Sequence, residues 1–156
     1  MHLAQMNVAR LIAPADDPRS ADFIDGLEPI NSLADGAPGF VWRMQADELD
    51  PRALIEHVDP MVITTYSVWE SRDDLWNFVY RSEHMDYLRR RREWFEHMRD
   101  PYAVMWWIPV GHVPTVPEGF ERLERLRTQG PGPEAFTFRD FYEDAEATAM
   151  PRHISS

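Results

Sequence analysis

The chain contains no cysteine and no lysine, so all 16 of its basic residues are arginines. Without cysteine it cannot form a disulfide, a thiolate nucleophile, an iron–sulfur cluster or a thiolate-ligated haem. Without lysine it has neither a Schiff-base amine nor the phosphate-binding lysine of a P-loop. Any chemistry it performs must therefore use histidine, tyrosine, arginine and carboxylates.

Positive charge is also scarce, because 27 Asp and Glu residues against 16 arginines give a formal net charge of −11. An acidic surface of this kind repels phosphate backbones and anionic lipid head groups, so we expect no binding to nucleic acid or membranes. The sequence lacks an apolar run of the ~18 residues that a membrane span needs, and its start has no signal-peptide pattern. We therefore expect a cytoplasmic protein.

A length of 156 residues, 44% of them hydrophobic, suits one globular domain with a sizeable core. We predict a single domain over residues 1–138 that includes a C-terminal helical extension, followed by an acidic tail over 139–156. Alternating apolar positions predict strands at 3–10, 40–45, 61–69 and 102–109. Helical spacing and capping residues predict helices at 18–33, 71–81 and 82–98, and a short helix around Phe120, Leu123 and Leu126.

The order strand, helix, strand, strand, helix pair, strand is the βαββαβ pattern of a ferredoxin-like α+β unit, which has one antiparallel sheet with helices on one face. Neither alternating set of side chains in strand 61–69 is strongly polar, so the second face should be covered as well. The simplest cover is another copy of the chain. We therefore expect a homodimer.

Four segments, at residues 67–71, 80–84, 88–95 and 106–114, resemble in the same order the bacterial family named Domain of Unknown Function 3291. The likeness extends from about Met1 to Phe138. That family is similar to the dimeric α+β barrel superfamily, which contains antibiotic-biosynthesis monooxygenases, and part of it resembles haem-binding relatives such as spheroidene monooxygenase. The resemblance implies a homodimer but does not supply a reaction.

Two histidines are candidates for catalysis. His84 lies near the start of a helix segment, on the edge of an apolar stripe with Leu88, where it could be a general base, a donor to a bound carbonyl or an axial haem ligand. The alternative is a histidine hydrogen-bonded between helix and sheet. His112 follows the last core strand, where it could close the mouth of a cavity, although exposed loop histidines are common.

The other histidines do not suggest a metal centre. They lack partners at metal-ligand spacing, and none belongs to a His-x-x-x-His pair, so we expect no zinc site built by the protein. They are His2, His57, His97 and His153.

The run Arg89 to Arg92 covers nearly the whole circumference of a helix, because consecutive helical residues are ~100° apart. At least one of these arginines should approach the sheet, a partner subunit or an anionic ligand, and Arg91 or Arg92 shares the face of Leu88. Ion pairing with the surplus carboxylates is the alternative. Arg81 is interpreted in the same way and is expected to point further inward.

Aromatic side chains are numerous, and most should simply form the core. Trp106 and Trp107 are adjacent in a strand and must point to opposite faces, so one of them could line a cavity for a flat apolar ligand. The sheet residues expected near that cavity are Asn7, Trp42, Thr64, Tyr66 and Trp106.

Two functions of different classes fit the sequence. The first is a small-molecule enzyme that resembles antibiotic-biosynthesis monooxygenases and acts on an aromatic or polyene metabolite in a pocket between sheet and helices. It would use no cofactor, or haem with His84 as the proximal ligand and arginines on the propionates. The second is a non-catalytic dimer that binds a hydrophobic small molecule.

Overall fold

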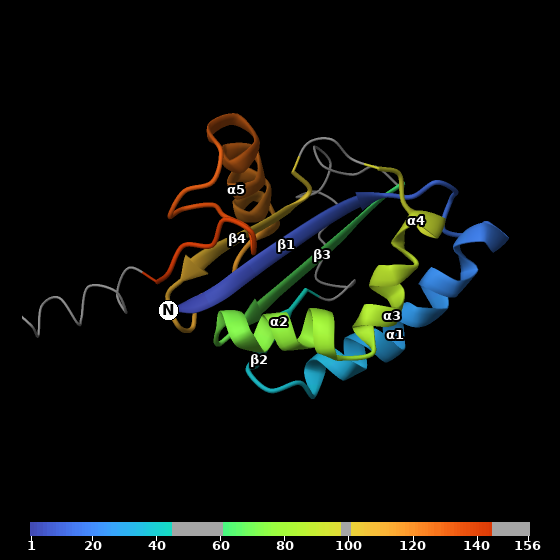
Figure 1. The fold of residues 1–156 in the computed structure, drawn as a ribbon, viewed down its shortest axis with the longest axis horizontal. Coiled ribbons are helices and arrows are strands. Elements are labelled where there is room, and N and C mark those ends of the chain that lie inside the picture. Colours follow the sequence, from blue (N-terminus) through green and yellow to red (C-terminus); the bar gives the residue numbers. More distant parts are fainter. Residues whose placement is uncertain (45–60, 98–100, 145–156) are drawn as a thin grey trace, which may run out of the picture.

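The computed structural model describes residues 1–44, 61–97 and 101–144. The acidic stretch from Asp47 to Asp59 lies outside these residues. Four strands and the helices between them follow the predicted order (Figure 1). They are β1 (His2–Arg10), the 3₁₀ turn η1 (Pro18–Ser20), α1 (Ala21–Asp35), β2 (Phe40–Arg43), β3 (Val62–Trp69), α2 (Arg72–Arg81), α3 (His84–Arg89), α4 (Arg91–Trp94), β4 (Ala103–Ile108) and α5 (Val116–Gln129).

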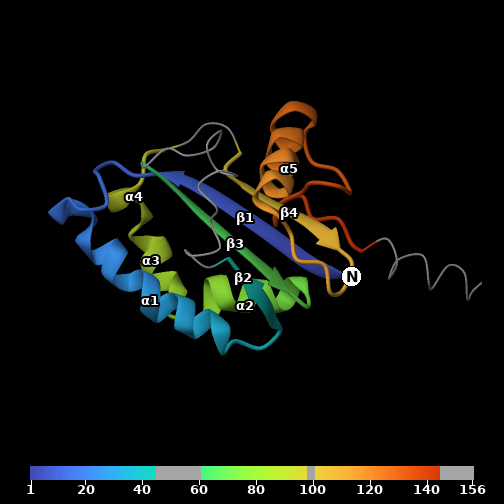
Figure 2. The ribbon, with the colours of Figure 1, turned by 180° about the vertical axis from the view of Figure 1, so that it is seen from behind.

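The strands form one sheet in the order β2-β3-β1-β4, and every neighbouring pair is antiparallel. The long central strands β1 and β3 run side by side across the molecule (Figures 1 and 2). This is the α+β, ferredoxin-like βαββαβ fold that the sequence predicts.

Helix starts were predictable because their capping residues act as expected. Asp17 accepts a hydrogen bond from the backbone N–H of Arg19 at 2.8 Å, at the start of η1, the turn that leads into α1. The Ser71 hydroxyl accepts one from the N–H of Asp74 at 3.1 Å, which begins α2. Each cap satisfies an N–H group that the first turn of a helix leaves without a helical partner.

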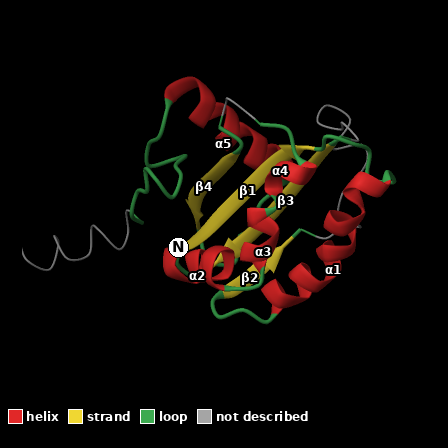
Figure 3. Ribbon diagram, turned by 45° about the vertical axis from the view of Figure 1, so that its right-hand side comes forward, coloured by secondary structure: helices red, strands yellow, loops and turns green. Residues whose placement is uncertain are grey.

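The two faces of the sheet are covered by different helices (Figure 3). On one face, which we call the helix side, Leu3 and Trp69 pack with Ala34 of α1 and Leu75 of α2. On the other face, which we call the α5 side, the core contains Leu123 of α5 and the side chains that alternate with the first set. The predicted cover of the second face therefore exists, but over β1 and β4 it is supplied by α5 of the same chain.

The adjacent tryptophans point to opposite faces, as predicted from strand geometry. Trp106 is fully buried in the core of the α5 side, whereas Trp107 packs with the core of the helix side. No helix in the described part of the chain combines the length and the apolar character that crossing a bilayer requires.

The chain after α5 packs back onto the sheet. Phe136 pairs with Met105 of β4 through backbone hydrogen bonds of 2.8 and 2.9 Å, so the chain makes a strand-like contact at this point. Phe141 lies 5.0 Å from the Phe136 ring, and the carbonyl of Tyr142 accepts a 2.9 Å hydrogen bond from the Trp107 indole. The packed domain thus continues past the predicted boundary at 138.

Close packing of α5 on the sheet gives a prediction for Gly119. A Cβ at this position would lie 2.5 Å from the Met6 sulfur and 2.9 Å from the Tyr66 ring. Gly119→Ala is therefore expected to lower the free energy of unfolding by about 1–3 kcal/mol through overpacking, measured by urea denaturation. Gly132→Ala is the control, because a Cβ there meets no atom within 4 Å. Equal effects of the two substitutions would contradict the close contact.

Candidate functional site

Polar side chains occupy the middle of the sheet on the helix side. We call Gln5 and Asn7 of β1 together with Thr65 and Ser67 of β3 the polar sheet centre. Gln5 pairs with Ser67 in the strand register, and Asn7 pairs with Thr65. The Gln5 amide donates to the Ser67 hydroxyl at 2.6 Å, and the Asn7 amide donates to the Gln5 oxygen at 3.3 Å.

The helices bury the two ends of this face but leave its middle accessible. Leu3 and Trp69 at one end are 0% exposed, and Leu11 at the other end is 1% exposed. Between them Thr65 is exposed and Gln5 is half-buried, although both point toward the helix layer. A polar surface at the centre of an otherwise apolar face therefore remains within reach of a small molecule.

His84 is held at the joint between α2 and α3. Its Nδ1 lies 3.2 Å from the carbonyl oxygen of Val79, in the last turn of α2. Its backbone N–H donates to the Ser82 hydroxyl at 3.1 Å, and that hydroxyl donates to the carbonyl of Phe78. The joint thereby satisfies two carbonyls that the end of α2 would otherwise leave unbonded.

These contacts fix the chemical state of the imidazole. A carbonyl oxygen can only accept, so Nδ1 carries the hydrogen and Nε2 carries the lone pair when the ring is neutral. Burial lowers the pKa of His84 from its usual range, and the hydrogen bond to Val79 opposes this only in part. His84 is therefore neutral at pH 7, with Nε2 as its basic nitrogen.

A series of contacts connects His84 with the polar sheet centre. The imidazole packs against Phe78, with ring centroids 5.3 Å apart, and Phe78 stacks on Trp69 at 5.1 Å. The Trp69 indole donates to the Ser67 hydroxyl at 2.9 Å. The predicted base and the predicted ligand-binding residue Asn7 thus belong to one connected set on the helix side.

A second cluster lies on the α5 side, around the predicted residue His112. Nε2 of His112 donates to Oε1 of Glu118 at 2.8 Å, and Oε2 of Glu118 accepts from the Trp106 indole at 3.0 Å. The Tyr66 hydroxyl donates to the carbonyl of Thr115 at 2.9 Å, and Trp42 packs edge-on against Tyr66 at 5.6 Å. Tyr66 and Trp106 are buried in the core beneath α5, whereas Trp42 is partly buried at its edge.

Glu118 is the residue of this cluster that the sequence analysis missed. It follows Thr115 in a T-x-x-E pattern, the signature of a capping box, and Thr115 does cap α5 by accepting from the N–H of Glu118 at 3.3 Å. The carboxylate instead reaches His112 and Trp106. Burial would raise the pKa of Glu118, but the hydrogen bonds from these two partners outweigh burial and hold that pKa below its usual range.

This lowered pKa predicts a pH-dependent contribution to stability. A carboxyl whose folded pKa is depressed stabilises the protein above its unfolded pKa of 4.5 and loses that contribution as pH falls through the folded value. Glu118→Gln is expected to remove about 1 kcal/mol near pH 6 and to flatten the fall in stability below pH 4.5, measured by urea denaturation. Glu121→Gln, on the exposed surface of α5, is the control and should leave the slope unchanged.

The structure separates the sheet residues that were expected around one cavity. Thr64 pairs with Val8, and Tyr66, Trp106 and Trp42 lie on that same α5 side. Asn7 alone points to the helix side, because its position in β1 has the opposite parity. The expectation of a single shared cavity is therefore wrong for Asn7.

The two candidate arginines lie in different environments. Arg81 is exposed, contrary to the inward orientation expected, because the last residue of α2 lies off the buried stripe of Leu75. Arg91 is half-buried, with its guanidinium 4.4 Å from the Tyr102 ring and 5.4 Å from the Phe95 ring. It therefore approaches the start of β4 by stacking on aromatic rings.

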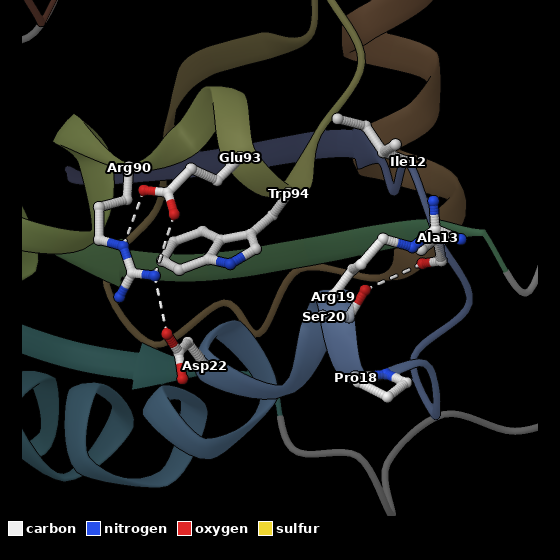
Figure 4. A pocket seen from close by; sticks show the side chains of 9 residues that line it. All are labelled: Ile12, Ala13, Pro18, Arg19, Ser20, Asp22, Arg90, Glu93 and Trp94. Carbon is white, nitrogen blue, oxygen red and sulfur yellow. Dashed lines mark hydrogen bonds and ion pairs between the residues drawn. The ribbon is translucent and has the colours of Figure 1, made fainter.

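Two hollows occur elsewhere on the described surface. One, of about 290 Å³, lies between Pro18 and Trp94, where Arg90 stacks over the Trp94 ring and bonds to Asp22 and Glu93 (Figure 4). The other, of about 410 Å³, runs along α5 beside Phe120. Neither is lined by His84 or His112. The described residues contain no cluster of three or more His, Asp or Glu side chains placed to hold a metal ion.

Comparisons with known proteins give one family match and a weak similarity to a solved structure. No curated protein matches the chain. A solved structure from Nitrosomonas europaea, described as a "putative antibiotic biosynthesis monooxygenase", is similar with a TM-score of 0.49 and 13% identity, over 70% of this chain and 92% of that chain. The family described as "Domain of unknown function (DUF3291)" matches residues 2–152. Because this match spans nearly the whole sequence, the chain belongs to the DUF3291 family.

Proposed function

We propose that this protein is a small-molecule enzyme whose site lies on the helix side, with His84 as general base. The proposal rests on one observation, the neutral imidazole whose Nδ1–H is held by the Val79 carbonyl. A base with a fixed tautomer and a lowered pKa is ready to accept a proton at Nε2 at neutral pH. The substrate we propose is a flat aromatic or polyene metabolite, as expected for a monooxygenase-like protein.

The reaction we propose needs only oxygen as a co-reactant. His84 Nε2 removes a proton from an acidic C–H of the substrate, and the resulting carbanion is stabilised by delocalisation into its ring system. The carbanion reduces O₂ and combines with it to form a hydroperoxide, which loses water to leave a carbonyl. The balance is R₂CH₂ + O₂ → R₂C=O + H₂O. The protein contributes deprotonation and positioning.

The described residues would offer haem a ligand for its iron but no suitable partners for its propionates. His84 would suit that role, because a carbonyl on Nδ1 leaves Nε2 for iron. The propionate partners do not fit, since Arg81 is exposed and the Arg91 guanidinium already stacks on Tyr102 and Phe95. We therefore derive no step through haem.

An oxygen electrode tests the proposal directly. Dithranol, an anthrone with an acidic C–H, is a suitable probe, because its conversion to the quinone consumes one O₂ and is followed by absorbance. Uptake above the rate of spontaneous oxidation that scales with protein concentration supports the enzyme. No increase with dithranol or with a panel of related anthrones contradicts it. Titration with haem, followed at the Soret band, checks the cofactor in the same preparation.

A non-catalytic ligand-binding protein is the second candidate. It is favoured by the structural role of the Ser82–His84 joint, which caps the carbonyl ends of α2 and would be needed without any catalysis. In that case dithranol would bind, seen as quenching of tryptophan fluorescence, and its oxidation rate would not change. The two measurements made together separate the candidates.

We also propose that the protein forms a homodimer. Trp42 and Met44 remain partly exposed at the edge of the α5-side core, where α5 does not cover β2. Size-exclusion chromatography with light scattering should give about twice the chain mass of 18.3 kDa. A monomer at micromolar concentration would contradict this proposal.

A further inference from the structure

The polar sheet centre has more hydrogen-bond donors than its own network uses. The amides of Gln5 and Asn7 supply two hydrogens each, and the Ser67 hydroxyl and Trp69 indole supply one each. Three hydrogen bonds connect the side chains of Gln5, Asn7, Ser67 and Trp69. Each bond uses one donor hydrogen, so three of the six hydrogens are used. Within residues 1–44, 61–97 and 101–144, the remaining hydrogens meet no acceptor from the chain. Exchanging the oxygen and nitrogen of both amides keeps three hydrogen bonds, and exchanging only one amide removes the bond between Asn7 and Gln5, so at least three hydrogens stay free in every assignment.

The free hydrogens lie where a ligand can reach them. Trp69 is fully buried and fixes the Ser67 hydroxyl, and Ser67 in turn fixes Gln5, so the network is anchored at its buried end. Asn7 forms the other end, half-buried and paired with the exposed Thr65. Water satisfies such donors in the absence of a ligand, and a ligand oxygen that replaces this water keeps the hydrogen bonds.

We infer that the polar sheet centre binds a carbonyl or phenolate oxygen of the ligand, with Asn7 as the principal donor. The inference rests on the proposed function, because it assigns the chemical class of the substrate for the same site. The side chains of the polar sheet centre carry no formal charge. With their surplus of donor hydrogens they match an oxygen acceptor on a flat apolar molecule. These donors do not match a ligand that is purely hydrocarbon, because it has no acceptor atom.

The same donors would assist the proposed proton transfer. When His84 Nε2 removes a proton from carbon next to a conjugated carbonyl, the negative charge moves onto the carbonyl oxygen. Fixed N–H and O–H donors directed at that oxygen stabilise the enolate more than the neutral ketone. Asn7 is therefore a binding residue whose contribution grows as the charge develops.

Equilibrium dialysis with two matched probes tests the inference. The probes are 1,4-naphthoquinone and naphthalene, which share a ring system and differ in two acceptor oxygens. Because the chain has no thiol and no lysine amine, the quinone has neither of its usual covalent targets, and intact mass spectrometry checks this. The proteins compared are the wild type, Asn7→Leu, Ser67→Ala and, as a control, Asn77→Leu on the exposed surface of α2.

The wild type is expected to bind the quinone about tenfold or more tightly than naphthalene. Asn7→Leu should remove most of that preference by weakening quinone binding, while naphthalene affinity stays the same and Asn77→Leu behaves as wild type. If Asn7→Leu fails to fold by circular dichroism, Ser67→Ala provides the same test. Equal wild-type affinities, or a preference that survives both substitutions, would overturn the inference.

The outcomes remain distinct from those of the proposed function. An Asn7-dependent preference for the quinone without oxygen uptake on dithranol would support this site and contradict catalysis. Oxygen uptake that depends on His84 but not on Asn7 would support the enzyme and overturn the donor assignment.

Discussion

Replacing His84 with glutamine is expected to lower protein-dependent oxygen uptake with dithranol by about 10²–10⁴-fold, the usual contribution of a positioned general base. Glutamine retains an amide N–H that can donate to the Val79 carbonyl, so the joint between α2 and α3 keeps its hydrogen bond. It has no basic nitrogen to replace Nε2. The loss should therefore appear in turnover, with the far-ultraviolet circular dichroism unchanged.

The pH profile gives a readout that a structural role would not produce. Because burial lowers the pKa of His84, the basic form persists below the usual range, and the wild-type rate should fall only at pH values under about 6.5. The residual rate of His84→Gln should lack this acidic limb. The free energy of unfolding should also fall at low pH. A buried neutral histidine opposes protonation, so folding is weakened as pH falls below the pKa of histidine in the unfolded chain.

His97→Gln is the matched control, because His97 is exposed in the chain that follows α4. It should leave both the rate and the pH profile at wild-type values. If His84→Gln lowers the thermal midpoint while dithranol oxidation stays at the wild-type rate, His84 has only its capping role. The binding function would then be the better interpretation.

The fold could be predicted from the sequence because its local signals agree with one another. Asp17 and Ser71 cap the helices that they were expected to start, and the β-branched run after Met61 forms β3. The alternation of apolar residues near the start of the chain predicts β1, in which successive side chains face opposite sides of the sheet. Each of these signals depends on neighbours within a few residues, which periodicity and capping describe well.

The arrangement of the site was harder to predict because it depends on contacts between distant residues. The helix at Leu123 was expected, but its position over β1 and β4 follows from Gly119, which lets the helix approach Met6 and Tyr66. The hydrogen bonds of the Glu118 carboxylate with His112 and Trp106 likewise depend on the position of α5 over the sheet. Asn7 pairs with Thr65 and therefore faces the opposite side from Thr64 and Tyr66, a relation that depends on the register between β1 and β3.

Removing the Phe136 side chain is expected to have the largest effect on stability. The residue is fully buried and packs with Trp107 at 6.4 Å, Phe141 at 5.0 Å and Tyr142 at 6.2 Å. Phe136→Ala should lower the free energy of unfolding by about 3–5 kcal/mol, the usual cost of deleting a buried phenylalanine. Urea denaturation followed by tryptophan fluorescence measures this directly.

Tyr142→Ala provides the comparison, because its side chain is 39% exposed while its backbone carbonyl, which the substitution retains, accepts from the Trp107 indole. It should cost only about 1 kcal/mol, since little apolar surface returns to water. A large loss at Phe136 with a small one at Tyr142 would show that the strand-like contact at Met105 fastens the chain after α5 to the sheet. A loss under about 1 kcal/mol for Phe136→Ala would mean that the domain ends before this contact, because a buried aromatic ring of the core cannot be removed at so low a cost.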